Sequence, residues 1–113
     1  MCTKSELQVV LEKIKDRSEK LFGQALDKII LYGSYARGDY TDESDIDIMI
    51  ILNCSDRDVR KMRRMATEIA SDISLEQDVF LSILLRDKKH YEENIEFFPF
   101  YRNISREGVA VYG

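Results

Sequence analysis

Two aspartates, Asp45 and Asp47, stand at the start of an apolar stretch and are separated by a single isoleucine. In an extended strand, two residues with this spacing point to the same side, with their Cα atoms roughly 7 Å apart. Like charges held this close resist joint ionisation unless a cation neutralises them. Hard oxygen ligands of this kind suit Mg²⁺ or Mn²⁺, which typically bind one or two carboxylates together with water and phosphate oxygens. The pair therefore predicts a divalent-cation site.

A third carboxylate is expected from a later strand. Residues 78–84 begin with an acid and continue as an alternating apolar run, much as residues 45–52 do. If these two strands pair side by side, Asp78 can approach the first two acids, and Glu76 is the alternative. Two metal ions about 3.5–4 Å apart require several carboxylates, at least one of them bridging, so a third acid would complete such a centre.

The glycines Gly33 and Gly38 have the spacing of a P-loop. However, Asp39 and Tyr40 stand where that loop requires a phosphate-binding lysine and a metal-binding hydroxyl. Both the cation and the metal ligand of that motif are missing. The P-loop interpretation is therefore rejected.

The Gly33–Ser34 turn nevertheless suits a phosphate group. It follows a short, branched, apolar segment, residues 28–32, which predicts a buried strand. A glycine lets the backbone approach a phosphate closely, and amides at the start of a short helix favour an anion. Ser34 adds a hydroxyl donor, and Arg37 adds a fixed positive charge one turn later. We therefore expect these residues to contact a phosphorylated ligand.

Periodicity predicts the elements that position these residues. Thr3 and Glu6 form a capping pair at the start of an amphipathic helix that extends to Gly23. A second helix begins at Ser55 or Asp56 and carries its apolar residues on one face. The expected helices are residues 4–23, 56–74, 88–95 and 100–107, and the expected strands are residues 28–32, 45–52 and 78–84.

The size and charge of the chain exclude several classes of protein. With 113 residues and 44% hydrophobic composition, residues 1–113 are expected to form one domain, without a separate substrate domain. A missing half would have to come from a partner or a second copy. The net charge of −4 argues against extended nucleic-acid binding. The second helix carries a basic stripe, formed by Arg57, Arg60, Lys61 and Arg64. It is interpreted as a solvated face, with a docking face as the alternative.

The cysteines and the N-terminal segment predict a cytoplasmic protein. Cys2 and Cys54 have neither CxxC spacing nor a set of histidines, so neither a zinc site nor a disulfide framework is expected. The N-terminus mixes charged and apolar residues, and no apolar run approaches the length of a membrane span. No histidine-based triad is supported, since His90 is the single histidine and has no nucleophile suitably spaced from it.

The segment GSYARGDYTDESDID, residues 33–47, resembles the signature of the DNA polymerase β-type nucleotidyltransferase superfamily. The Ala-Arg-Gly that follows the Gly-Ser pair, the short chain, and the closing stretch at residues 103–108 resemble its minimal nucleotidyltransferase (MNT) branch. This resemblance implies an α/β (α+β) fold, with a small mixed β-sheet and helices packed mainly on one face.

The resemblance also implies roles for individual residues. A nucleoside triphosphate, ATP, would lie over Gly33 and Ser34, with Arg37 near the triphosphate tail. Asp45 and Asp47 would be the metal-binding and catalytic carboxylates for two Mg²⁺ or Mn²⁺ ions. Asp78 would be the third carboxylate by position, with Glu76 as the alternative. The implied reaction is metal-assisted transfer of a nucleoside monophosphate to a hydroxyl group.

Minimal members of this branch commonly act as antitoxins beside a small helical HEPN protein. The implied reaction is then the transfer of AMP from ATP to a tyrosine of the HEPN toxin, which silences its RNase activity. Two alternatives remain. The first is a small-molecule nucleotidyltransferase that works with a partner subunit. The second is a non-catalytic module that neutralises a toxin by binding alone.

Overall fold

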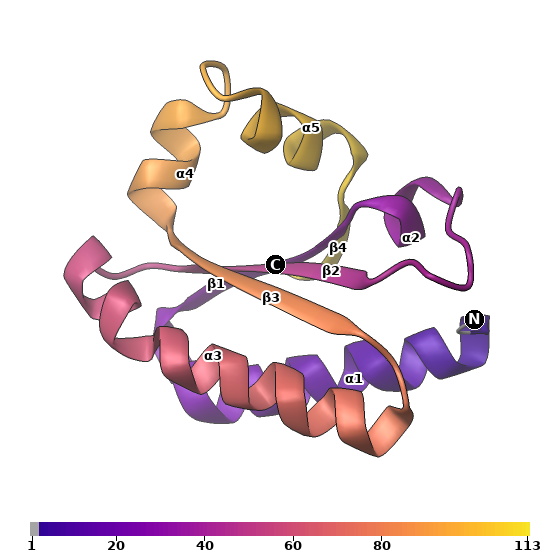
Figure 1. Ribbon diagram of the computed structural model, residues 1–113. Helices are drawn as coiled ribbons and strands as arrows, with labels where there is room; N and C mark the ends of the chain where they lie inside the picture. Colours follow the sequence, from indigo (N-terminus) through magenta and orange to yellow (C-terminus); the bar gives the residue numbers. More distant parts are fainter. Residues whose placement is uncertain (1–2) are drawn as a thin grey trace.

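A computed structural model of the chain describes residues 3–113, so Cys2 lies outside the described residues. Within residues 3–113, no helix is both long and apolar enough to cross a membrane. Figure 1 shows helices above and below one sheet. The elements in chain order are α1 (Lys4–Phe22), a 3₁₀ turn (Gly23–Ala25), β1 (Leu26–Tyr32), α2 (Ser34–Arg37), β2 (Ile46–Leu52), α3 (Asp56–Gln77), β3 (Leu81–Asp87), α4 (Lys88–Asn94), α5 (Pro99–Glu107) and β4 (Val109–Tyr112).

The four strands form one mixed sheet in the order β3-β2-β1-β4. β1 pairs antiparallel with both β2 and β4, whereas β2 and β3 are parallel and are joined by the crossover helix α3. β2 lies inside the sheet, and its segment Ile48–Leu52 is fully buried. A strand covered on both faces is expected to be continuously apolar, as this one is. The predicted mixed α/β architecture is confirmed.

The two long helices, α1 and α3, pack against one face of the sheet (Figure 1). Val10 and Ile14 of α1 and Ile69 and Ile73 of α3 are almost completely buried there. They meet the even-numbered isoleucines of β2, because alternate strand residues point to opposite faces. The hydroxyl of Thr3 accepts a hydrogen bond from the Glu6 N–H at 3.1 Å, which confirms the predicted cap of α1.

Two shorter helices, α4 and α5, cover the other face of the sheet (Figure 1). Met49 and Ile51 of β2 point to this side and form a second apolar cluster with Tyr91, Tyr101 and Ile104. The odd-numbered side chains of β2 therefore belong to this layer. Asp47 and Asp45 continue the same alternation toward the start of the strand.

One predicted boundary is wrong in a way that matters for the site. The third strand begins at Leu81 rather than at Asp78, because α3 continues to Gln77. Asp78 ends that helix in the left-handed conformation, with φ 52°, and its N–H donates to the Ser74 carbonyl. The alternating apolar pattern of residues 78–84 therefore begins at the C-cap of α3, three residues before β3 starts. β4 was not predicted from the sequence.

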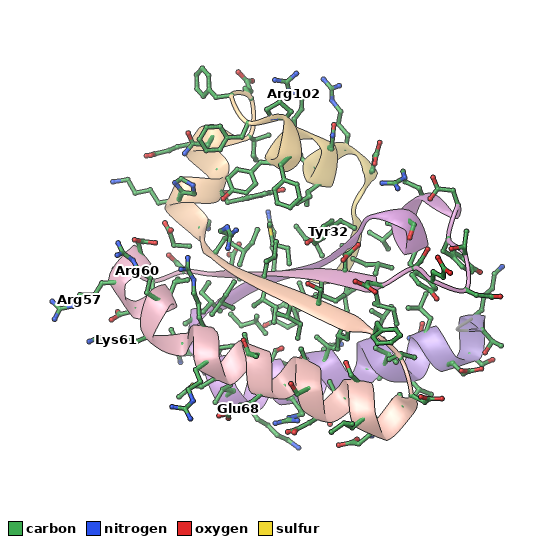
Figure 2. The ribbon with its side chains drawn as sticks, viewed as in Figure 1. Tyr32, Arg57, Arg60, Lys61, Glu68 and Arg102 are labelled. Atoms are coloured by element: carbon green, nitrogen blue, oxygen red, sulfur yellow. The ribbon has the colours of Figure 1, made fainter. Side chains whose placement is uncertain are left out.

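The basic stripe of α3 lies on the surface. Figure 2 shows Arg57, Arg60 and Lys61 projecting from α3 away from the sheet. Arg60 forms an ion pair with Asp56 of the same helix, and the Arg64 Nε lies 3.7 Å from Glu68 Oε1. Pairs of this kind between exposed residues one turn apart contribute little to stability. The stripe is partly neutralised within its own helix.

Candidate active site

The turn that follows β1 runs directly against the side chain of Asp47. Gly33 has φ 74° and ψ −156°, a conformation that residues with a β-carbon rarely adopt. A β-carbon built on Gly33 would overlap Asp47 Oδ2 and lie 3.3 Å from Asp47 Cγ. The absence of a side chain at Gly33 is therefore what allows the backbone of the turn to approach the carboxylate.

Asp45 and Asp47 lie at the N-terminal end of β2, close enough to interact electrostatically. Asp47 is half-buried and Asp45 is exposed. Burial is the main cause that raises the pKa of Asp47, and the charge of Asp45 raises it further, whereas Arg37 partly offsets both. The pair thus carries unfavourable charge that a cation would relieve.

Tyr32 lies beside Asp47 in the sheet, as the last residue of β1 opposite that position of β2. Its ring meets Phe100 of α5 edge-on, with the ring centroids 5.7 Å apart. Figure 2 shows Tyr32 in the interior, between the sheet and α5. Burial, followed by the charge of Asp47, raises the pKa of Tyr32 to about 12. Its hydroxyl is therefore protonated at neutral pH.

Arg37, the last residue of α2, joins the glycine turn to α5. Its Nε donates to Asp39 Oδ2 at 3.2 Å, and its Nη1 lies 3.6 Å from Glu107 Oε2. The Arg37 side chain is 44% exposed, so its guanidinium can exchange these carboxylates for another anion. Arg37 also acts electrostatically on Asp47.

A cavity of about 210 Å³ adjoins the turn on the α5 side. It is lined by Tyr32, Gly33, Arg37, Phe100, Asn103, Ile104 and Glu107. Apart from Gly33 and Arg37, these residues were not predicted as site residues. The available signal was the stretch at residues 103–108, which covers the end of α5 and its C-cap, Gly108. Its contact with the turn depends on tertiary packing, which periodicity does not reveal.

The other predicted carboxylates lie in different surroundings. Asp78 is exposed at the end of α3. Glu76 pairs with Lys13 of α1, with Nζ and Oε2 3.2 Å apart, in the helical layer on the opposite face of the sheet. Among residues 3–113 there is no group of three His, Cys, Asp or Glu side chains arranged to hold a metal ion. The structure brings Asp45 and Asp47 together, and a completed three-carboxylate cluster stays a prediction.

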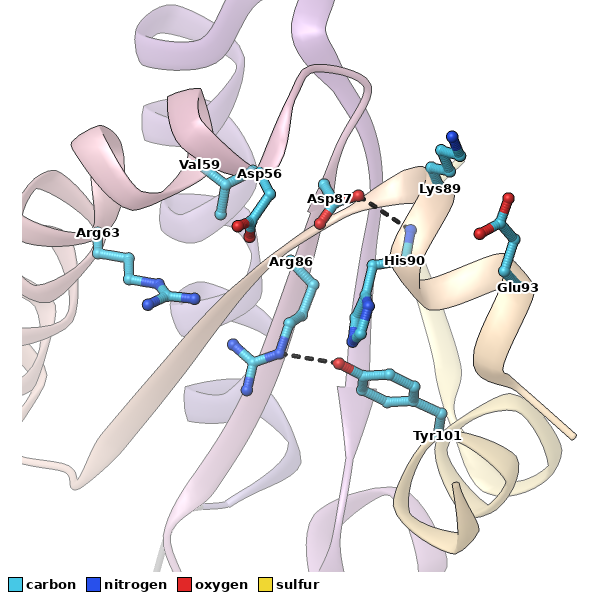
Figure 3. A pocket seen from close by; sticks show the side chains of 9 residues that line it. All are labelled: Asp56, Val59, Arg63, Arg86, Asp87, Lys89, His90, Glu93 and Tyr101. Carbon is cyan, nitrogen blue, oxygen red and sulfur yellow. Dashed lines mark hydrogen bonds between the residues drawn. The ribbon is translucent and has the colours of Figure 1, made fainter. Parts of the chain in front are cut away.

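A second cavity, of about 530 Å³, lies at the other end of β2 and β3 (Figure 3). It is lined by residues from α3, β3, α4 and α5, none of which was predicted as a site residue. Arg86 donates from its Nε to the Tyr101 hydroxyl at 3.1 Å, and Asp87 caps α4 by accepting from the His90 N–H at 2.9 Å. These interactions join the end of β3 to the helices above it.

Comparison with known proteins gives a consistent assignment. Residues 11–111 match the family model described as a nucleotidyltransferase domain. The chain is 33% identical over 108 residues to the "Putative protein adenylyltransferase MJ0604" of Methanocaldococcus jannaschii, covering 96% of this chain and 99% of that protein. It is 34% identical over 83 residues to the "Putative protein adenylyltransferase MJ0141" of the same organism, covering 74% and 82%.

Two solved structures share the fold. One is a crystal structure of "the toxin-antitoxin with AMP-PNP", with a TM-score of 0.58 and 18% identity, covering 91% of this chain and 73% of that chain. The other is a crystal structure of a mutant of the toxin-antitoxin MntA-HpeT, with a TM-score of 0.55 and 17% identity, covering 96% and 73%. At this level of identity the likeness concerns the fold alone.

Proposed function

The chain belongs to the nucleotidyltransferase domain family, and we propose that it transfers AMP from ATP to a hydroxyl group of a partner protein. The proposed acceptor is a tyrosine of a small helical toxin of the HEPN type, with this chain as the antitoxin. Two observations support the proposal: similar proteins are named as protein adenylyltransferases, and the fold is shared with toxin-antitoxin structures.

The observation that carries the proposal is the packing of the Gly33 turn on Asp47. This packing places the Gly33 backbone, which carries no side chain, next to the carboxylate pair of Asp45 and Asp47. A phosphate group held over the turn would therefore lie beside both acids. Ser34 and the first amides of α2 supply hydrogen-bond donors at this place, and Arg37 supplies a positive charge. Phosphate and carboxylates of like charge require a cation between them.

The two acids suit a divalent cation. Their oxygens are the hard ligands that Mg²⁺ and Mn²⁺ prefer. Burial, and then the charge of Asp45, raise the pKa of Asp47 more than Arg37 lowers it, so a bound cation would favour the ionised pair. Asp45 and Asp47 would hold the ion together with phosphate oxygens. When bound, the ion supplies charge neutralisation for phosphoryl chemistry and lowers the pKa of a bound hydroxyl.

In the proposed reaction, the acceptor oxygen forms a bond to the α-phosphorus of ATP while the bond to the β-phosphate oxygen breaks. Pyrophosphate leaves with the bridging oxygen, and the hydroxyl proton of the acceptor passes to solvent water. Arg37 and Ser34 would hold the departing phosphates, where negative charge develops. The protonated Tyr32 hydroxyl lies beside Asp47 and is neutral, so Tyr32 adds no further negative charge to the site.

One observation favours a second candidate function, that of a non-catalytic module that neutralises a toxin by binding. No described group of three potential ligands is arranged for a metal ion, although two-metal centres use several carboxylates. Such a module would bind its partner equally well without either aspartate. This difference separates the two functions.

The experiment follows a radioactive label from ATP, in the presence of Mg²⁺ and a purified HEPN-type partner protein. Asp47→Asn is compared with the matched control Glu43→Gln, which removes an exposed carboxylate from the preceding loop. Label on the partner protein with wild type and Glu43→Gln, but not with Asp47→Asn, supports the proposal. Label on a small molecule indicates the small-molecule alternative. A stable unlabelled complex that survives Asp47→Asn indicates the binding module.

A further inference from the structure

The position beside Asp47 in the next strand is occupied by Ser82. In the parallel ladder between β2 and β3, Ile46 pairs with Leu81, and Asp47 pairs with Ser82. Paired residues of neighbouring strands project to the same face of a sheet. The packing agrees, because Leu84 belongs to the apolar cluster under α4 and α5, whereas Leu81 contacts the cluster under α1 and α3. Ser82 is therefore the lateral neighbour of Asp47 on the site's face.

A carboxylate at this position would extend the acid pair. Neighbouring strands lie about 4.8 Å apart, so side chains from paired positions can share a cation. Serine supplies a single neutral oxygen instead. Asp78 is the nearest preceding acid of this segment, but it lies before β3, exposed at the end of α3. The strand next to Asp47 thus contributes no negative charge at the level of the site.

We propose that this chain holds one divalent cation per bound nucleotide, at Asp45 and Asp47, and that the neutral Ser82 is what limits the site to one. The inference rests on the proposed function, since it concerns the same nucleotide site. Two carboxylates satisfy one Mg²⁺-like ion that also binds phosphates and water. A second ion needs a further carboxylate, which the Ser82 position does not supply. Ser82 thereby determines the metal content of the site.

Native mass spectrometry of the protein with AMP-PNP and Mn²⁺ tests this proposal, because it counts the ions in each protein–nucleotide complex. Wild type should carry one Mn²⁺, and Ser82→Asp should carry two. Ser82→Asn is the matched control, since it has nearly the same shape as aspartate without its charge, and it should carry one. The count in wild type requires no variant, so it decides the proposal even if Ser82→Asp does not fold.

Two Mn²⁺ ions in the wild-type complex would overturn the inference, and the loss of one of them in Asp78→Asn would assign the third carboxylate to Asp78. A folded Ser82→Asp complex that still carries a single ion would overturn it as well. In each of these cases the nucleotide is bound, so the proposed function stands. Wild-type protein that takes up no AMP-PNP would overturn the proposed function itself, and the inference with it.

Discussion

Gly33 and Asp47 are packed so closely that no β-carbon fits between them. The glycine directly follows β1 and is the N-cap of α2, and the aspartate belongs to the neighbouring antiparallel strand β2. This contact fixes the phosphate-suited turn against one carboxylate of the pair. The two halves of the sequence signature are therefore joined by steric contact as well as by the register of the strands.

Gly33→Ala should abolish nucleotidyl transfer and lower stability. The added methyl group would displace the Asp47 carboxylate or the turn, and alanine is disfavoured at φ 74°. The backbone effect alone is expected to cost roughly 1–3 kcal/mol, because φ 74° and ψ −156° lie in a region that is essentially restricted to glycine. Transfer of label from ATP and thermal unfolding are the two measurements.

Gly23→Ala is the matched control for this substitution. Gly23 has a similar backbone conformation, with φ 54° and ψ −128°, but nothing lies within 4 Å of an added β-carbon. It should lose comparable backbone stability and retain transfer. Equal loss of activity in both variants would show that general destabilisation, rather than contact with Asp47, explains the effect of Gly33→Ala.

Asp47→Asn should stabilise the protein at neutral pH when divalent cations are removed by a chelator. Burial and the charge of Asp45 raise the pKa of Asp47 in the folded state. The contribution of Asp47 to folding stability is therefore fully present below its unfolded pKa of 3.8, and it is lost as the pH rises through the folded pKa. We expect Tm to rise at neutral pH and to change little below the unfolded pKa. A Tm that falls at neutral pH would contradict this account of the carboxylate pair.

Removal of the Asp47 charge should lower the pKa of Tyr32. That pKa is about 12, and Asp47 is the second of the causes that raise it, after burial. An ultraviolet titration of Asp47→Asn, with Tyr32→Phe used to identify the Tyr32 transition, measures the change. An unchanged Tyr32 transition would mean that the two side chains do not interact across the β1–β2 pair.

Arg37→Ala should weaken ATP binding about tenfold or more, since hydrogen bonds to charged groups contribute roughly 1.5–3 kcal/mol. Glu107→Gln is the companion variant, because it removes a carboxylate 3.6 Å from the same guanidinium. It should bind ATP as well as wild type or more tightly, since Arg37 then has one competing anion fewer. Equally weakened ATP binding in both variants would indicate that the Arg37–Glu107 ion pair acts structurally, by holding α2 against α5. Isothermal titration with AMP-PNP distinguishes the outcomes.

The local pattern predicted the elements around the site because their causes are local. The Thr3 cap, the apolar face of α3 and the buried run of β2 each follow from side chains within a few residues of one another. The Gly-Ser turn and the Asp-x-Asp pair were likewise visible as residue types at a fixed spacing. Their juxtaposition follows from the antiparallel pairing of consecutive strands.

The remaining features depend on contacts between distant segments. The start of β3 was misplaced because Asp78 adopts the left-handed conformation, which the sequence does not mark with a glycine. The pairing of Ser82 with Asp47 and the approach of Glu107 to Arg37 depend on how β3 and α5 dock. Neither follows from periodicity, and both alter the composition of the site.

The most direct test of the central claim compares ATP labelled at the α-phosphate with ATP labelled at the γ-phosphate, using wild type, Mg²⁺ and the partner protein. Nucleotidyl transfer at Asp45 and Asp47 predicts that the partner retains the α-label, that the γ-label leaves with pyrophosphate, and that Asp47→Asn abolishes labelling. Retention of the γ-label would indicate phosphoryl transfer and contradict the account. Labelling that is unchanged in Asp47→Asn would place the chemistry elsewhere.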